Sequence, residues 1–387
     1  MTTERRKHIA FVTWLGDGNF GTTLQAYALF TTFKKLGYAA TYVWPFDLSW
    51  GSRLRRIPRR AVQIALGLFG LHPHRRSSPH PPPSPPLKAA KLNRFLAEEI
   101  PQIHIRSRKN LHTLLDTTDA FCVGSDQLWN TYYSKDTFML LPWAENKKRI
   151  SYATSIGTKD IAPDMRATYR QALLKFDHLS LREESGRSAV AQLTGRTDIE
   201  TVLDPTLLLS PEDWRSVARH AEFEAPLPAI PSKPFALCYL IGKVPSYAAQ
   251  LAEVVRQTGL HRIIQLPSRE APAFSLPGAL VYEAAAVREF VSLLDAASLV
   301  ITDSFHATTL SILLEKPFVE FLRFQDHAPG GQNSRIHDLL SVFHLQNRLY
   351  AQDSVAWAEP LDYSPAASLL ASARADSLAY LVNAIEA

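Results

Sequence analysis

The sequence has few of the features that would assign it to a specialised class of protein. It contains only two cysteines, Cys122 and Cys238, which lie far apart in the chain. This excludes a disulfide framework and a zinc site built from Cys-x-x-Cys pairs, and it suits a reducing compartment. No apolar run reaches the length of about 18 residues that a membrane-spanning helix needs, so no transmembrane segment is predicted.

The excess of positive over negative charge is also small. The chain carries 42 Lys and Arg residues against 37 Asp and Glu residues, which gives a net charge of +5. This mild excess is not that of a dedicated nucleic-acid-binding protein, although it suits local contacts with anionic ligands. The N-terminal apolar run is short and ends in Gly16-Asp17-Gly18, which favours a strand over a signal peptide. We therefore expect a cytoplasmic protein that binds no nucleic acid.

Short runs of β-branched and aromatic residues alternate with stretches of helical periodicity. The expected strands are 9–13, 120–123, 150–153, 235–240, 262–266, 299–302 and 318–322. The expected helices are 22–36, 164–176, 184–193, 247–257, 286–296 and 305–314. Such alternation predicts βαβ units with parallel sheets, and a chain of 387 residues suggests two domains. The expected fold class is α/β, with two Rossmann-like domains facing a cleft.

Two proline-rich segments interrupt the alternation. Residues 72–87 carry seven prolines and residues 221–234 carry four, so we expect neither to form a regular element. The second segment precedes a new strand and is the expected domain boundary. We therefore assign 1–225 to an N-terminal domain, which includes a basic and proline-rich excursion at about 50–87, and 226–387 to a C-terminal domain with a ligand-binding loop.

The excursion also contains a cluster of arginines in front of the short apolar run 61–71. The cluster consists of Arg53, Arg55, Arg56, Arg59 and Arg60. Basic residues beside an apolar run would rest on an anionic membrane face as a peripheral contact. The alternative is a surface helix that packs its apolar side on its own domain.

Ligands of doubly wound sheets bind at the carboxyl ends of strands, so we searched the loops between strands and helices. The loop 16–22 is rich in glycine and opens a helix, whose N-terminus favours an anion. Its glycines match the spacing of a dinucleotide-binding loop, but the acidic residue expected about 20 residues later is missing. A tight turn with a helix cap is the favoured interpretation, and Asn19 and Gly21 are candidate ligand contacts.

Two further loops carry polar side chains. The loop 123–130 contains Ser125, Asp126, Gln127 and Trp129, which could bind sugar hydroxyls and stack on a sugar ring. The alternative there is a helix cap with a core tryptophan. Arg182, in a third loop, could present its planar guanidinium to a carboxylate or phosphate. From the residues alone, a surface ion pair with Glu183 or Glu184 is the favoured explanation of Arg182.

The loop after the expected strand 299–302 is the most informative. Asp303 and Ser304 end the strand, and His306 falls in the first turn of the following helix. Free amides, the helix dipole and a histidine converge there, which predicts an anion site beside a proton donor or acceptor. Arg323 and Arg335 would add positive charge from further along the chain. We find no spacing of ligands typical of a metal site and predict none.

These segments, taken in order, resemble the polysaccharide pyruvyl transferase family. The matching blocks are 18–21 with 24–29, 123–130, 151–157, 181–186, 202–206 and 301–306. The resemblance implies the GT-B architecture of two-domain glycosyltransferases. It also implies transfer of a pyruvyl group from phosphoenolpyruvate to a sugar diol of a cell-surface or exopolysaccharide, or of its lipid-linked precursor. Phosphate would leave, a pyruvate ketal would form, and no cofactor is expected.

The resemblance also implies roles for individual residues. His306 would be the acid or a phosphate contact, and Asp303 would orient it or bind a hydroxyl, unless Asp303 is a plain helix cap. The implied donor-binding residues are Arg182, Ser304, Arg323 and Arg335. The implied acceptor-binding residues are Asn19, Gly21, Ser125, Asp126, Gln127 and Trp129.

The chain departs from the family pattern at two positions beside the histidine. Ser304 stands where members often carry an arginine, and Ala307 stands where a glycine is common. Arg323 or Arg335 would then replace the missing arginine. Two alternatives remain open from the sequence: a GT-B-type glycosyltransferase that uses a nucleotide sugar, and a non-catalytic carbohydrate-binding relative. A membrane-linked acceptor would place the protein at the inner membrane face.

Overall fold

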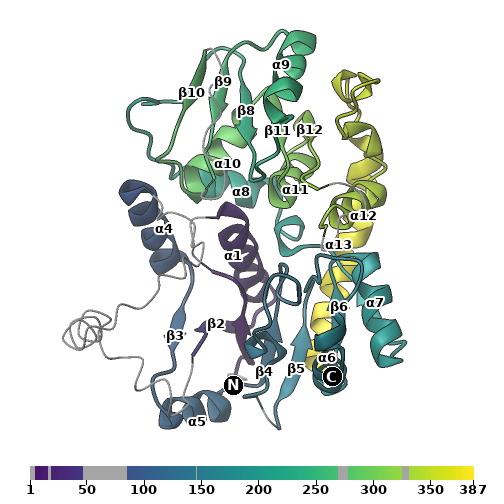
Figure 1. The fold of residues 1–387 in the computed structure, drawn as a ribbon. Coiled ribbons are helices and arrows are strands. Elements are labelled where there is room, and N and C mark those ends of the chain that lie inside the picture. Colours follow the sequence, from purple (N-terminus) through teal and green to yellow (C-terminus); the bar gives the residue numbers. More distant parts are fainter. Residues whose placement is uncertain (1–4, 16–18, 47–84, 145, 269–277, 325–330) are drawn as a thin grey trace, which may run out of the picture.

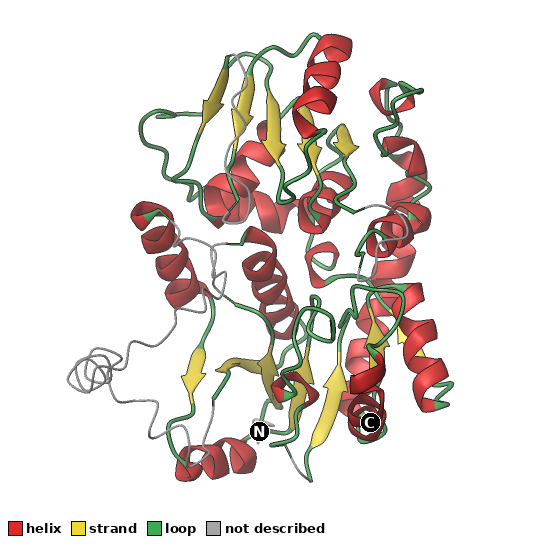
Figure 2. Cartoon of the chain, viewed as in Figure 1, coloured by secondary structure: helices red, strands yellow, loops and turns green. Residues whose placement is uncertain are grey.

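Two parallel five-stranded sheets form the two halves of the molecule, with helices packed beside both (Figures 1 and 2). The computed structural model describes residues 5–15, 19–46, 85–144, 146–268, 278–324 and 331–387. The strand orders are β3-β2-β1-β4-β5 and β10-β9-β8-β11-β12. In both sheets the order reverses beside the first strand of the set, which is the doubly wound arrangement. The expected α/β class with two Rossmann-like sheets is confirmed.

The first sheet is built from strands that are mostly buried at its centre, whereas no residue of the edge strand β3 is buried. Its strands are β1 (His8–Val12), β2 (Ala39–Trp44), β3 (Gln102–His104), β4 (Ala120–Val123) and β5 (Lys148–Ser151). All four residues of β4 are buried, as in a parallel strand covered on both faces. A separate parallel pair, β6 (Leu179–Leu181) and β7 (Ile199–Thr201), is linked to β5 by a single bridge between Ile150 and His178.

The second sheet follows the same plan. Its strands are β8 (Ala236–Tyr239), β9 (Ile263–Gln265), β10 (Ala279–Val281), β11 (Leu299–Thr302) and β12 (Phe318–Glu320). Strand β11 lies between β8 and β12 and is fully buried, because Leu-Val-Ile-Thr offers apolar side chains to both faces. The bounds of β4 and β11 are those expected from the sequence.

Helices connect most of the strands. They are α1 (Phe20–Lys35), α4 (Pro86–Glu99), α5 (Arg108–Thr117), α6 (Arg166–Leu173), α7 (Glu184–Thr194), α8 (Pro211–Ala218), α9 (Tyr247–Thr258), α10 (Val287–Ala296), α11 (Phe305–Leu313), α12 (Ser334–Val342) and α13 (Ser364–Glu386). The side chain of Asn19 caps α1 by accepting a hydrogen bond from the Gly21 amide. Gly195 and Gly259 end α7 and α9 in the left-handed region.

The two proline-rich segments have different outcomes. Residues 221–234 form no helix or strand, as expected, and the predicted boundary at 225–226 falls among them. The first segment was expected to be irregular through residue 87, but Pro86 and Leu87 begin α4. Proline is tolerated there because the first turn of a helix has no partner for its missing amide. Residues 72–84, the arginine cluster and the run 61–71 lie outside the described residues.

The two halves meet along α1, α11 and α13. Phe20, the first residue of α1, stacks on Phe290 of the second half with ring centroids 4.5 Å apart. The last helix, α13, crosses from one half to the other (Figure 1). The hydroxyl of Tyr363, just before α13, bonds the carbonyl of Lys316, whereas Tyr380, near its end, bonds the carbonyl of Ser151 in the first sheet. This junction fixes the loops that form the cleft.

Candidate functional site

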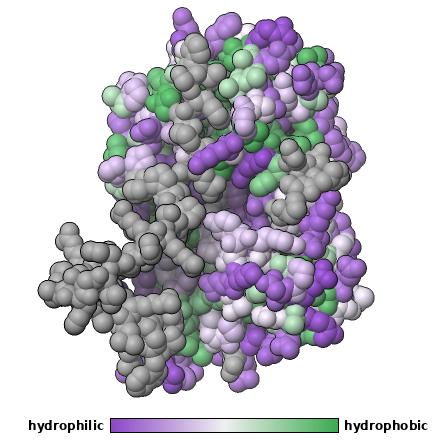
Figure 3. All heavy atoms as spheres, viewed as in Figure 1, coloured by the Kyte–Doolittle hydropathy of each residue, from purple (hydrophilic) through white to green (hydrophobic). Residues whose placement is uncertain are grey.

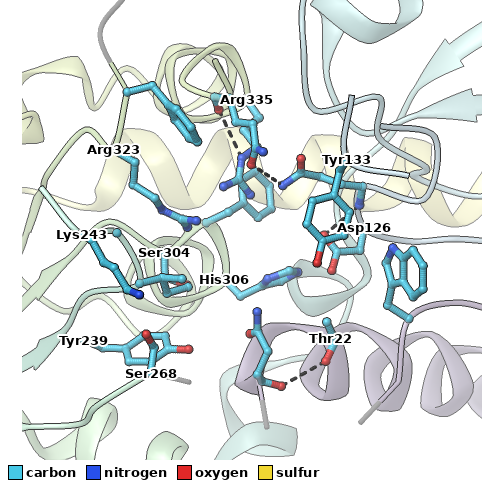
Figure 4. A pocket seen from close by; sticks show the side chains of 18 of the residues that line it. Thr22, Asp126, Tyr133, Tyr239, Lys243, Ser268, Ser304, His306, Arg323 and Arg335 are labelled. Carbon is cyan, nitrogen blue, oxygen red and sulfur yellow. Dashed lines mark hydrogen bonds between the residues drawn. The ribbon is translucent and has the colours of Figure 1, made fainter. Parts of the chain in front are cut away.

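A cleft of about 680 Å³ lies between the two halves, where loops after β1, β4, β8, β11 and β12 come together. The face of the molecule in Figure 3 is hollowed where the halves meet, and hydrophilic residues border the hollow. Carboxyl ends of strands from two parallel sheets thus face one cavity, as expected for ligand binding in this fold class. Both halves contribute polar side chains to it (Figure 4).

His306 lies between the two halves at the start of α11. Strand β11 and α11 are buried throughout, so the first turn of α11 is held rigidly at the cleft, and the His306 side chain is only 7% exposed. Its Nε2 lies 3.5 Å from Oδ2 of Asp204, which belongs to the first half. On the other side, the ring lies against Gly21 near the N-terminus of α1. A Cβ atom at Gly21 would stand 2.2 Å from Nδ1, so only glycine leaves room for the imidazole.

The buried carboxylate of Asp204 contacts both His306 and Arg182. Its Oδ2 lies 3.0 Å from Nη1 of Arg182, and it also accepts a hydrogen bond from the Ser125 hydroxyl. Burial alone would raise the pKa of Asp204, but His306 and Arg182 together hold it well below its usual range. The carboxylate therefore stays ionised. Sequence reasoning gave Asp204 no role, although it lies in the loop after strand β7 and within the family block 202–206.

Arg182 lies behind the cleft rather than on its surface. Its side chain is 1% exposed and lies near three carboxylates, those of Asp204, Asp126 and Glu183. Its guanidinium carbon stands 3.9 Å from the centroid of the Phe305 ring, which is a cation–π contact. The expected ion pair with Glu183 is present at 3.7 Å, but the prediction that it lies on the surface is wrong, because both side chains are buried. A direct grip on the donor stays a prediction, because Arg182 is absent from the residues that line the described cleft.

The expectation that Asp303 orients His306 is corrected by the structure. Asp303 accepts hydrogen bonds from the amides of Ile241 and Gly242 and from the hydroxyl of Tyr247. It also lies 3.3 Å from Nε of Arg323. Its carboxylate therefore fixes the loop after β8 and the base of Arg323, and the carboxylate beside the imidazole is that of Asp204. Asp303 does not cap α11 either, since Ser304 is the N-cap and has no side-chain capping bond.

Arg323 and Arg335 bring positive charge to the cleft from the second half. Arg323 donates two hydrogen bonds to the carbonyl of Asp303, and Arg335 donates one to the carbonyl of Gln332. Burial, reinforced by the neighbouring charges of Arg323 and Arg182, lowers the pKa of Arg335 to about 9. Within the described parts of the chain, no carboxylate forms an ion pair with Arg335. An anion in the cleft would relieve this repulsion. Ser304 also lines the cleft, and Figure 4 places it below Arg323 and to the left of His306.

The expected acceptor residues divide into two groups. Asn19, Asp126 and Gln127 line the cleft. The other three, Gly21, Ser125 and Trp129, are buried and are not among the residues that line it. Gly21 lies against His306, Ser125 bonds Asp204, and the indole of Trp129 donates to the carbonyl of Met139 inside the core. The stacking role predicted for Trp129 is therefore wrong, and its alternative, a core tryptophan, is correct.

Several cleft residues carried no sequence signal strong enough to single them out. They are Trp14, Tyr133, Lys243, Ser268, Phe305 and Gln332. Gln332 joins the halves, because the Gln127 amide donates to its side-chain oxygen at 3.0 Å. Asp126 adopts a positive φ of 80°, an uncommon conformation for a residue with a side chain, and this turns the loop after β4 toward the cleft.

No three His, Cys, Asp or Glu side chains among the described residues lie close enough together to hold a metal ion. No helix in the same residues is long and apolar enough to cross a membrane.

Comparison with known proteins decides the family. Residues 19–322 match the sequence profile described as polysaccharide pyruvyl transferase, which covers well over half of the chain. The chain belongs to this family. The polysaccharide pyruvyl transferases are transferase enzymes, so the cleft is that of an enzyme, and the resemblance noted in the sequence blocks is confirmed. A search of curated proteins gave no match.

Solved structures similar to this pyruvyl transferase family member share little sequence with it. UDP-GlcNAc 2-epimerase from Neisseria meningitidis has a TM-score of 0.48 and 10% identity, covering 96% of this chain and 100% of that one. MurG from Acinetobacter baumannii has a TM-score of 0.45 and 10% identity, covering 98% and 99%. ADP-heptose lps heptosyltransferase II from E. coli has a TM-score of 0.37 and 12% identity, covering 96% and 99%.

Proposed function

We propose that this enzyme transfers the pyruvyl group of phosphoenolpyruvate to a sugar diol of a cell-surface polysaccharide or exopolysaccharide, or of its lipid-linked precursor. The observation that carries the proposal is the placement of Arg323 and Arg335 beside His306 in one cleft. Phosphoenolpyruvate has a carboxylate and a phosphate, and guanidinium groups bind both with paired hydrogen bonds. Arg335 is buried and forms no ion pair with a carboxylate among the described residues, so an anionic ligand would stabilise its charged form.

The reaction needs one proton at the start. Protonation of C3 of phosphoenolpyruvate makes C2 electrophilic, and the oxygen of one sugar hydroxyl then forms a bond to C2. The bond between C2 and the phosphate oxygen breaks, phosphate leaves, and the second hydroxyl closes the ring on C2. Of the two hydroxyl protons, one replaces the proton given to C3 and the other leaves with phosphate. The product is a cyclic ketal, and no redox partner is required.

His306 is the side chain best placed to give that proton. It lines the cleft next to Ser304, and a positioned acid of this kind contributes about 10²–10⁴-fold to a rate. Asp204 is ionised, and its carboxylate lies beside the imidazole and fixes the orientation of the ring. Ser125 and Thr206 hydrogen-bond Asp204, which keeps the carboxylate in place. Asp204 is thus a positioning residue that acts through His306.

Donor binding tests the proposal directly. Calorimetric titration of phosphoenolpyruvate should show binding to the parent enzyme and at least about tenfold weaker binding to Arg335→Ala, since a charged hydrogen bond contributes roughly 1.5–3 kcal/mol. The matched control is Arg256→Ala, because Arg256 is an exposed arginine paired with Glu253 on α9. Arg256→Ala should bind like the parent. Binding of a uridine or guanosine diphosphate in place of phosphoenolpyruvate would contradict the proposal and favour a nucleotide-sugar donor.

A further inference from the structure

Asp126 is the only residue with a carboxylate among the described residues that line the cleft. It belongs to the first half, in the loop after β4, and Figure 4 shows it on the opposite side of His306 from Arg323 and Lys243. The second half thus supplies the cations of the cleft, and the first half supplies one acid. Because opposite charges attract, an anionic donor is drawn to the cations, and the acid is left beside the space for the sugar.

The two oxygens of this carboxylate have different surroundings. Oδ1 accepts a hydrogen bond from the amide of Gln127 at 2.9 Å and lies 3.7 Å from Nη1 of Arg182. Oδ2 accepts no hydrogen bond from any described residue, and the side chain is 13% exposed where it lines the cleft. The backbone is held in place, because the amide of Ser155 donates to the Asp126 carbonyl at 2.9 Å. Asp126 therefore offers one anchored oxygen and one that is open to accept a proton.

A series of contacts behind the cleft fixes Asp126 relative to His306. Nη1 of Arg182 lies between two carboxylates, 3.7 Å from Asp126 and 3.0 Å from Oδ2 of Asp204. The same oxygen of Asp204 lies 3.5 Å from Nε2 of His306. A proton donor and a proton acceptor from different halves thus meet at one cavity, which is the arrangement that general acid–base catalysis needs.

We propose that Asp126 is the catalytic base that takes the proton from the attacking hydroxyl of the acceptor sugar. The inference rests on the proposed function and goes beyond the hydroxyl contact that the sequence predicted for Asp126. A hydroxyl is a weak nucleophile until its proton is removed, and a carboxylate within hydrogen-bond reach removes it as the new bond forms. The sugar would therefore lie between Asp126 and the donor held by Arg323 and Arg335.

The proton transfers balance with His306 as the acid and Asp126 as the base. His306 gives its proton to C3 of phosphoenolpyruvate, while the first hydroxyl bonds to C2 and gives its proton to Oδ2 of Asp126. The bond between C2 and the phosphate oxygen then breaks, and phosphate takes that proton from Asp126. The second hydroxyl closes the ring on C2 and returns a proton to the imidazole. Both side chains regain their starting states, and no redox partner is needed.

The test compares variants of the full chain, with phosphoenolpyruvate as donor and methyl galactopyranoside, glucopyranoside and mannopyranoside as acceptors. Asp126→Asn keeps the size of the side chain but cannot take the proton, so kcat for ketal formation should fall about 10²–10⁴-fold. The KM for phosphoenolpyruvate should stay level or fall, because no cation is lost from the cleft. Asp160→Asn is the matched control, because Asp160 pairs with Arg166 and the hydroxyl of Tyr132 and does not line the cleft. It should leave kcat unchanged.

Small anions separate a base from a structural partner of Arg182. Asp126→Ala leaves room for formate or nitrate, which are planar anions of similar size that can both pair with a guanidinium. Formate is by far the stronger base of the two. Formate should therefore restore ketal formation by Asp126→Ala in a concentration-dependent manner, whereas nitrate should not. Neither anion should speed the reaction of the parent or of Asp160→Asn.

The outcomes separate this inference from the proposed function. If the parent forms a ketal and Asp126→Asn has the parent's kcat, Asp126 is not the base and pyruvyl transfer stands. Equal rescue of Asp126→Ala by formate and nitrate, or no rescue by either, would also overturn the base while transfer stands. If the parent forms no ketal with any of the three sugars, the proposed function and this inference both fail.

Discussion

Gly21 and His306 offer a sharp test of how the two halves build the site. A Cβ atom at Gly21 would stand 2.2 Å from Nδ1, 2.9 Å from Cγ and 3.0 Å from Cε1 of the imidazole, whereas ordinary contact begins at 3.4 Å. Gly21→Ala must therefore move the ring by about 1 Å or more. A displacement of that size at a reacting group costs on the order of 10²-fold in rate. We expect kcat to fall by about that factor in Gly21→Ala.

The same substitution should have opposite effects on stability in two backgrounds. In the parent, overpacking against His306 costs about 1–3 kcal/mol, partly offset by a gain of up to about 1 kcal/mol because alanine is the better helix former in α1. In His306→Ala the ring is gone, so only the helix gain remains. The free energy of unfolding, measured by urea denaturation, should thus fall in the first background and rise or stay level in the second.

A double-mutant cycle reports the coupling between these two residues as the difference between the backgrounds. The structure predicts a coupling of about 1–3 kcal/mol, and this holds whatever reaction the enzyme catalyses. Equal changes in unfolding free energy for Gly21→Ala with and without His306 would refute the contact. Unchanged kcat in Gly21→Ala would refute the claim that His306 needs this position.

Three further outcomes follow from the site and its surroundings. Asp204→Asn removes the charge behind His306, so we expect kcat to fall at least about 10²-fold with a smaller change in donor KM, as steady-state assays would show; an unchanged kcat would contradict its positioning role. Burial raises the pKa of Glu320 to about 8. Because this pKa is higher in the folded than in the unfolded protein, the folded protein loses stability as the pH rises from the pKa of the unfolded state to about 8. Urea titrations should show that the free energy of unfolding of the parent falls between pH 5 and pH 8, and that it depends less on pH in Glu320→Gln. The same pH dependence in both proteins would contradict a raised pKa of Glu320. In the proposed function Arg323 and Arg335 supply the charge that binds the donor, so turnover should survive EDTA. Complete loss of turnover that added divalent cations restore would contradict this expectation.

The sequence predicted the parts of this molecule that depend on local patterns. Continuous apolar runs gave the buried strands 120–123 and 299–302 with their observed bounds, since parallel strands are covered on both faces. His306 was predicted to lie at a cleft because it falls in the first helical turn after the strand 299–302. The three-residue strands β3, β6 and β10 were missed, whereas β9 and β12, which are equally short, were found because they lie within the longer runs 262–266 and 318–322.

Partners distant in the chain were not predictable from these patterns. Asp204 and His306 meet across the junction of the halves, and no local spacing encodes that meeting. Arg182 was expected to be exposed because arginine usually is, but three nearby carboxylates compensate its burial. In the loop after β4, sequence composition could not tell whether Trp129 faces the core or a ligand, so a stacking role was predicted for a residue that is buried.

The most direct test of pyruvyl transfer is a ¹³C NMR assay with phosphoenolpyruvate labelled at C2, the sugar diol methyl galactopyranoside as acceptor, and D₂O as solvent. The account predicts that the C2 signal moves from the vinyl to the ketal region, that one deuterium enters the new methyl group, and that one phosphate appears per ketal. His306→Ala should form little or no ketal. Free labelled pyruvate without ketal, or ketal formed equally fast by His306→Ala, would contradict the central role given to this cleft.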